Sequence, residues 1–129
     1  MKRLIVDLDH TITLGAPSGY ADAVANRALI DQLHRYKEDG FVIVISTSRS
    51  MRTYEGNIGK INAHTLPVAI EWLRRHNVPF DEIHVGKPWC GHDGFYIDDR
   101  AVRPSEFLSK SYGEIVQMLD AEKGKSPCF

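Results

Sequence analysis

Residues 41–46 read Phe-Val-Ile-Val-Ile-Ser, which is the strongest strand signal in the chain. A shorter apolar run at residues 4–6 predicts a second buried strand, because a strand of apolar residues alone can be covered on both faces. Between the two runs, residues 21–38 carry apolar side chains near helical spacing, and Gly40 supplies a helix stop. This order predicts a strand, helix, strand unit.

The same order repeats further along the chain. Thr65 is a candidate N-cap for a helix over residues 66–76, and a strand near residues 82–85 follows. A short apolar run at residues 95–97 predicts a fourth strand, and residues 112–122 predict a last helix. The alternation of strands and helices predicts an α/β fold with a parallel sheet covered on both faces.

The stretch at residues 50–64 fits neither the helical nor the strand period and contains Gly56 and Gly59. A loop of this length is uncommon in a compact domain and is usually functional. Because it directly follows the strand at residues 41–46, we expect it to lie over the edge of the sheet where that strand ends.

Length and composition limit the class of protein. A chain of 129 residues predicts one domain over residues 1–129, and 43% apolar residues suffice for an ordinary core. The net charge of -1 argues against a general nucleic-acid or membrane-surface binder. The sequence contains neither a signal peptide nor an apolar run of membrane-spanning length, so we expect a cytoplasmic location. Cys90 and Cys128 read as reduced thiols.

Polar side chains follow each predicted strand, where the loops of an open parallel sheet converge on a ligand. They are Asp7 and Asp9 after the first strand, Thr47 after the second, Lys87 after the third, and Asp98 and Asp99 after the fourth. Phosphoryl transfer needs such a set, because an aspartate can attack phosphorus while cations and hydroxyl groups neutralise the transferred oxygens. Four clustered carboxylates would require a cation, and oxygen ligands favour magnesium.

These residues resemble the four motifs of the haloacid dehalogenase (HAD) superfamily of phosphatases. The match consists of Asp7-Leu8-Asp9-His10-Thr11-Ile12, Ser46-Thr47-Ser48-Arg49, Gly86-Lys87-Pro88-Trp89 and Asp98-Asp99, in that order. One such motif is a moderate signal, whereas four in order and at fitting spacing are a strong one. The resemblance implies a three-layer Rossmann-like domain with a parallel sheet.

The resemblance also implies a role for each matching residue. Asp7 would be the nucleophile and a magnesium ligand, and Asp9 would be the general acid and base and would lend its backbone carbonyl to the metal. Thr47 and Lys87 would hold the phosphoryl oxygens. Asp98, Asp99 or both would complete the metal site. Arg49 has two equally open roles, since its planar donors suit either the substrate phosphate or a neighbouring acid.

A narrower resemblance, to small phosphatases of capsular polysaccharide biosynthesis, rests on residues 57–62 and 84–89. It implies a phosphorylated sugar or related small metabolite as substrate. Residues 11–41 have room for one helix, so we expect no inserted cap domain. The site would then be open, covered only by residues 50–64 or by a partner subunit in an oligomer.

Two other functions fit part of the pattern. Arg49 and Asp98-Asp99-Arg100 also resemble polynucleotide end phosphatases, although the near-neutral charge argues against nucleic acid. A non-catalytic phospho-receiver module uses similar residues, but it places its acidic pair after the first strand, whereas the adjacent pair here comes last. A zinc site at Cys90 and His92 would lack the further Cys or His ligands that such a site needs.

Overall fold

The computed structural model describes residues 2–16 and 18–123. The chain divides into two compact units, Met1–Trp89 and Cys90–Phe129.

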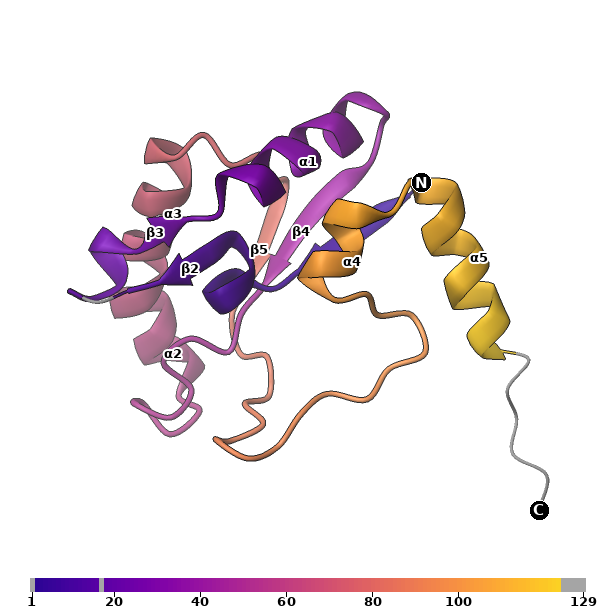
Figure 1. Ribbon diagram of the computed structural model, residues 1–129. Coiled ribbons are helices and arrows are strands. Elements are labelled where there is room, and N and C mark those ends of the chain that lie inside the picture. The colour runs from indigo at the N-terminus through magenta and orange to yellow at the C-terminus, as the bar shows by residue number, and fades with distance from the viewer. Residues whose placement is uncertain (1, 17, 124–129) are drawn as a thin grey trace, which may run out of the picture. The chain divides into compact units, whose positions relative to one another are not determined.

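A three-stranded parallel sheet forms the centre of the first unit (Figure 1). Its strands are β1 (Arg3–Val6), β4 (Val42–Ser46) and β5 (Glu82–His84), in the order β1-β4-β5. Val6 pairs with Ile45, and Ser46 pairs with His84, so all three strands end at the same edge of the sheet. The predicted α/β class and parallel sheet are confirmed.

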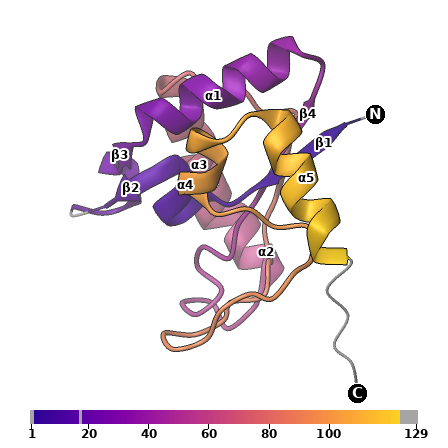
Figure 2. The same cartoon turned by 45° about the vertical axis from the view of Figure 1, so that its right-hand side comes forward.

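Two helices make the connections between these strands (Figures 1 and 2). Helix α1 (Arg27–Glu38) lies between β1 and β4 in the chain, and α3 (Leu66–Arg75) lies between β4 and β5. Their apolar stripes and the central strand supply most of the buried side chains. These include Leu29, Ile30 and Leu33 of α1, Ala69, Trp72 and Leu73 of α3, and Ile43, Val44 and Ile45 of β4. Burying a side chain of this size contributes about 1.5–3 kcal/mol, so this cluster is the main stabilising element of the unit.

The prediction of one helix between residues 11 and 41 was wrong at its start. Helix α1 begins at Arg27 because the Asn26 side chain caps it, accepting a hydrogen bond from the Leu29 N–H at 3.3 Å. The residues before it form an antiparallel hairpin of β2 (Thr13–Gly15) and β3 (Val24–Ala25), with the short 3₁₀ turn η2 (Tyr20–Asp22) between them.

This hairpin is tied to α3 by side chains that donate to its backbone. Trp72, which is only 1% exposed, donates from Nε1 to the Ala23 carbonyl at 2.9 Å. Arg75 of the same helix donates to the Ala21 carbonyl. The hairpin is therefore anchored at η2, near its tip, by a helix that follows it by about fifty residues in the sequence.

The expectation of a loop over residues 50–64 was also wrong in part. Residues 58–65 are helical, as α2 (Ile58–Lys60) and the π-helical turn η3 (Ile61–Thr65), and they lead directly into α3. Asn57 starts this run, because its side chain accepts from the Lys60 N–H at 3.1 Å. Thr65 is not an N-cap, since its hydroxyl donates to the Ser50 hydroxyl at 2.7 Å.

Strand β1 is not buried on both faces as its sequence predicted. Ile5 is 61% exposed, and the burial of β1 alternates along the strand. The alternation means that one face of β1 is covered within the first unit and the other face is not. An apolar run alone does not show whether one face or both faces of a strand are covered.

The second unit contains α4 (Pro104–Ser109) and α5 (Tyr112–Lys123). The last helix was predicted within one residue.

The fourth strand was a wrong prediction, because residues 95–97 have no ladder partner in the described chain and Ile97 is 90% exposed. A run of three apolar residues is too short to identify a strand without a neighbour. Cys128 lies outside the described residues. No helix of the described part is long and apolar enough to cross a bilayer.

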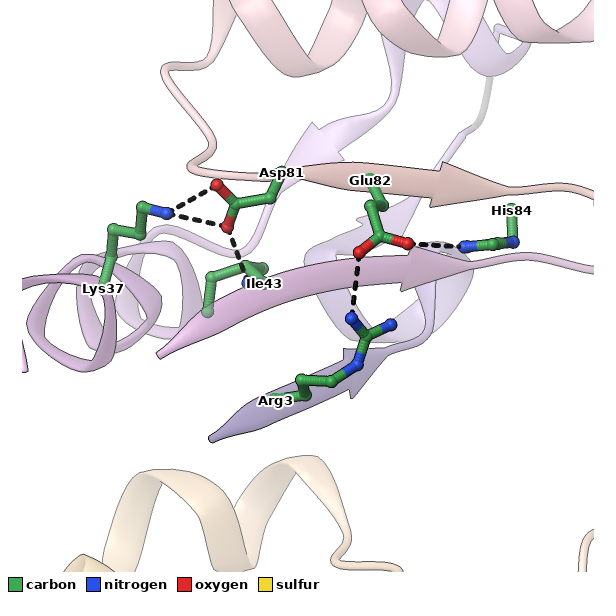
Figure 3. A network of polar contacts seen from close by, with 6 residues as sticks. All are labelled: Arg3, Lys37, Ile43, Asp81, Glu82 and His84. Atoms are coloured by element: carbon green, nitrogen blue, oxygen red, sulfur yellow. Dashed lines mark hydrogen bonds and ion pairs between the residues drawn. The ribbon is translucent and has the colours of Figure 1, made fainter. Parts of the chain in front are cut away.

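Ionic contacts join the sheet to α1 at the end opposite the strand carboxyl ends (Figure 3). Lys37 Nζ lies 2.6 and 2.7 Å from the two carboxylate oxygens of Asp81, and the Ile43 N–H donates to the same carboxylate at 2.9 Å. Arg3 of β1 pairs with Glu82 of β5 at 3.0 Å. The hydrogen bonds from Lys37 and from the Ile43 N–H hold the pKa of Asp81 below its ordinary value of 3.8.

The lowered pKa of Asp81 predicts how stability changes with pH. The ionised carboxylate contributes stability above pH 3.8, and the contribution disappears as the pH falls through the lower pKa of the folded state. We expect Asp81→Asn to lower the free energy of unfolding at pH 7 by at most about 1 kcal/mol, because the pair is partly exposed. Urea unfolding should show this difference shrinking below pH 3.8.

A double-mutant cycle with Lys37→Met isolates the pair from other acid effects. The coupling between the two substitutions should be present at pH 7 and absent in acid. A coupling that is unchanged at acid pH would contradict the proposed cause.

Candidate active site

The chain turns sharply after β1, in the segment η1 (Leu8–Ile12). Asp9 and His10 have non-helical backbone angles within it, and His10 has a φ of 63°, which is uncommon for a residue other than glycine. Asn26 holds the end of the turn by donating from its side-chain amide to the Thr11 carbonyl at 3.0 Å. The turn therefore presents Asp7 and Asp9 on a short, fixed piece of backbone.

Asp7 faces two donors, one on each oxygen. Lys87 Nζ donates to Oδ1 at 3.4 Å, and the Thr11 hydroxyl donates to Oδ2 at 3.0 Å. The Asp7 side chain is 36% exposed and that of Lys87 is 24% exposed, so both remain accessible. An accessible carboxylate beside a cation is suited to meeting an anionic ligand, because the lysine neutralises charge on the ligand as well as on the acid.

Backbone hydrogen bonds beyond the strand ends fix Lys87 at this place. The Thr47 N–H donates to the His84 carbonyl at 2.9 Å, and the Lys87 N–H donates to the Thr47 carbonyl at 3.2 Å. Gly86 lies between them with a φ of +84°, and a Cβ built there would be 2.6 Å from Ile58 Cδ1. The positive φ favours glycine at this position, whereas Ile58 Cδ1 is the free end of a side chain and can move aside.

Asp9 is held differently, by a buried arginine. Arg49 donates from Nε and Nη2 to the two carboxylate oxygens of Asp9, at 3.0 and 2.7 Å. The Arg49 side chain is 2% exposed, and its guanidinium carbon lies 4.1 Å from the ring centre of Tyr20 in η2. The Arg49 N–H also donates to the Thr47 hydroxyl at 3.0 Å, and Thr47 itself is buried.

The structure thus brings together five of the predicted site residues at one edge of the first unit. These are Asp7, Asp9, Thr47, Arg49 and Lys87. Tyr20 and Asn26 also belong to this arrangement, and the sequence analysis did not identify them. Tyr20 lay next to a helix predicted from residue 21, where no pattern marked the hairpin. Asn26 was detectable in principle as an N-cap residue.

Asp98 and Asp99 belong to the second unit, where both are exposed. The Asp98 carboxylate accepts from the Arg100 N–H at 2.8 Å, which is an ordinary turn contact. Within residues 2–16 and 18–123, no three His, Cys, Asp or Glu side chains are arranged to hold a metal ion. Asp7 and Asp9 belong to the first unit and Asp98 and Asp99 to the second, so the magnesium ligand set stays a prediction.

The close approach at Gly86 predicts the effect of adding one methyl group. Gly86→Ala places a Cβ against Ile58 and at an unfavourable positive φ, whereas Gly91→Ala has a φ of +77° but no neighbour within 4 Å. Left-handed backbone alone costs about 1–2 kcal/mol, so we expect each substitution to lose about that much, since the free end of the Ile58 side chain can move away from Gly86→Ala. The free energy of unfolding in urea measures both. A much greater loss for Gly86→Ala than for Gly91→Ala would contradict this expectation.

Comparison with known proteins includes a close match to a solved structure. No family model and no curated protein matches the sequence. The crystal structure of D,D-heptose 1.7-bisphosphate phosphatase from B. bronchiseptica, complexed with magnesium and phosphate, matches with 17% identity and a TM-score of 0.46, over 74% of this chain and 54% of that chain. So weak a similarity supports no inference. The crystal structure of a structural-genomics target from Vibrio cholerae is 62% identical, with a TM-score of 0.93 over 95% of this chain and 99% of that chain. The chain belongs to the same family as this Vibrio cholerae protein.

Proposed function

We propose that this protein is a phosphatase that hydrolyses a phosphate monoester through a covalent intermediate on Asp7. The observation that carries the proposal is the pairing of Asp7 Oδ1 with Lys87 Nζ at 3.4 Å, at the edge where three parallel strands end. A lysine that contacts the attacking carboxylate is placed to bind the phosphoryl oxygens as well, since all of them carry negative charge. Thr47 is proposed as a further phosphate ligand.

The reaction would proceed in two displacements at phosphorus. In the first, a carboxylate oxygen of Asp7 forms a bond to phosphorus while the bond from phosphorus to the ester oxygen breaks, and the leaving oxygen takes a proton. In the second, water attacks the same phosphorus, the bond to Asp7 breaks, and inorganic phosphate leaves with the free carboxylate restored. The chain must therefore supply one proton and later remove one.

Asp9 is proposed as the group that moves these protons. It lies two residues from Asp7 on the same fixed turn, and both of its oxygens contact Arg49, whereas Asp7 has no arginine contact in the described chain. The fixed direction of the Asp9 carboxylate is what supports its proposed role as general acid and base, and the accessible, lysine-paired Asp7 is proposed as the nucleophile.

The finer parts of the proposal rest on the family resemblance of the sequence. They are a requirement for magnesium, with Asp98 or Asp99 completing a site at Asp7 and Asp9, and a sugar-linked or other small phosphorylated substrate used in capsule or polysaccharide biosynthesis. The cytoplasmic location, the single domain over residues 1–129 and an oligomer that covers the site also remain predictions.

A polynucleotide end phosphatase is the alternative within the same chemistry, and a non-catalytic phospho-receiver is the alternative outside it. Asp7 could be the nucleophile in a small-molecule phosphatase and in a polynucleotide end phosphatase. The two phosphatases differ in substrate, because binding of the second kind to single-stranded DNA would fall steeply with salt. Stable phosphorylation of the protein without release of phosphate would identify a receiver.

The first prediction of this proposal concerns magnesium. We expect hydrolysis of para-nitrophenyl phosphate in the presence of Mg²⁺ to be abolished by a chelator and restored by excess Mg²⁺, because clustered carboxylates and phosphate oxygens need a cation. Steady-state release of para-nitrophenolate measures this effect. Full turnover in metal-free buffer would remove magnesium from the proposal but would leave the role of Asp7 open to test.

The second prediction separates Asp7 from Asp9. Asp7→Asn should abolish transfer from every substrate, because an amide is a poor nucleophile. Asp9→Asn should still accept a phosphoryl group from para-nitrophenyl phosphate, whose leaving group departs without a proton, but should hydrolyse the intermediate very slowly. Stopped-flow measurements should show a burst of at most about one equivalent of phenolate with Asp9→Asn and none with Asp7→Asn.

The reverse pattern, with a burst from Asp7→Asn and none from Asp9→Asn, would show that the nucleophile is misassigned. Asp31→Asn is a suitable control, because Asp31 is an exposed residue of α1 that pairs only weakly with Arg27 at 3.6 Å. It should turn over like wild type.

A further inference from the structure

The three nitrogens of the Arg49 guanidinium are all engaged or buried within the protein. Nε and Nη2 both donate to Asp9, and Nη1 is buried without a hydrogen-bond partner in the described part of the chain. The side chain as a whole is 2% exposed. A residue that binds substrate phosphate must present donors to the open site, as Lys87 does with an exposed fraction of 24%. The geometry therefore disfavours phosphate binding, which is one of the two roles that the sequence left open.

Arg49 is instead held in place from several directions. Its backbone N–H donates to the Thr47 hydroxyl at 3.0 Å, which fixes the start of its side chain. The ring of Tyr20 covers the guanidinium at 4.1 Å, as a cation lying over an aromatic face. Tyr20 belongs to η2. Trp72 and Arg75 of α3 hold this turn in place by donating to the Ala23 and Ala21 carbonyls. The guanidinium is thus supported by both the sheet edge and the hairpin.

A fork of two parallel hydrogen bonds fixes the plane and the direction of a carboxylate, which a single lysine contact does not. Each oxygen of Asp9 uses one lone pair on Arg49 and retains another, which can take up a proton; the protonated oxygen can then give that proton to the leaving group. We infer that Arg49 is a positioning residue, which aims the Asp9 carboxylate at the leaving oxygen and at the attacking water without touching substrate. This inference rests on the proposed function and deepens it.

Three roles for Arg49 make different predictions for Arg49→Met and Arg49→Lys. A phosphate-binding role predicts a raised KM and weaker inhibition by inorganic phosphate. A purely structural role predicts a loss that is equal for all substrates. A positioning role predicts a fall in kcat/KM that grows as the leaving group becomes more basic, because kcat/KM reports the first displacement and general acid catalysis matters most for groups that must be protonated.

The experiment measures kcat and KM for a series of aryl phosphates and one alkyl phosphate, with inhibition by inorganic phosphate. Since general acid catalysis contributes about a hundredfold to ten-thousandfold, we expect the kcat/KM of Arg49→Met to fall at least about tenfold more on the alkyl ester than on para-nitrophenyl phosphate. Arg49→Lys, which keeps the charge but cannot form the fork, should give the same pattern. Inhibition by phosphate should stay within about twofold of wild type.

Asp9→Asn and Asp9→Asn/Arg49→Met provide the decisive comparison. If Arg49 acts only through Asp9, the double variant should show the same dependence on the leaving group as Asp9→Asn alone. Arg3→Met is the matched control, because it removes another arginine–carboxylate pair, at 3.0 Å to Glu82, from an exposed place at the far end of the strands. Its leaving-group dependence should equal that of wild type.

An unchanged leaving-group dependence in both Arg49 variants, or a tenfold loss of phosphate inhibition, would overturn the inference. Failure of the proposed function looks different, because wild-type protein would then not turn over or would not depend on Asp7. If Arg49→Met does not fold, a measurement that needs no turnover still tests the contact between Arg49 and Asp9. In wild type, the Arg49 Nε–H signal in a ¹⁵N spectrum should exchange slowly with solvent, and Asp9→Asn should accelerate this exchange. Equal exchange in the two proteins would also overturn the inference.

Discussion

The parallel pairing of β4 with both β1 and β5 is the constraint on which the candidate site depends. Parallel strands in register must end at the same edge, so residues forty and eighty positions apart in the sequence meet there. The backbone continues this pairing past the strands, where Thr47 bonds to the His84 carbonyl and Lys87 bonds to the Thr47 carbonyl. The buried side chains of β4 hold the ladder together from its centre.

At this edge of the sheet, the two neighbouring acids Asp7 and Asp9 have different cationic partners. Asp7 receives a lysine that is itself accessible, and Asp9 receives an arginine that is not. Two carboxylates at such close positions would otherwise repel each other, and the separate cations reduce that repulsion. The difference between them comes from distant parts of the chain, since Lys87 follows β5 and Arg49 follows β4. Local sequence alone would make the two aspartates equivalent.

The sequence was sufficient where one local pattern decides the outcome. The strands at β1, β4 and β5 and the helices α3 and α5 were predicted from apolar periodicity, and the residues that follow the strands were found by position. Contacts between residues far apart in the chain could not be predicted from the sequence. Tyr20 over Arg49 and Trp72 bonded to Ala23 depend on how the hairpin packs, and no period encodes this. The exposed run at residues 95–97 failed for the same reason, because a strand needs a partner.

The contact between Gly86 and Ile58 bears on what supports the Asp7 side mechanically. Ile58 is the first residue of α2, which continues through η3 into α3, and Gly86 directly precedes the lysine that contacts Asp7. Because the Ile58 atom at this contact is the free end of an exposed side chain, the contact can yield by rotation of that side chain. The backbone beside Lys87 therefore keeps its place through its own hydrogen bond to Thr47, and not through the helical run that starts at Ile58. The mechanical support of the Asp7 side is thus the strand ladder itself.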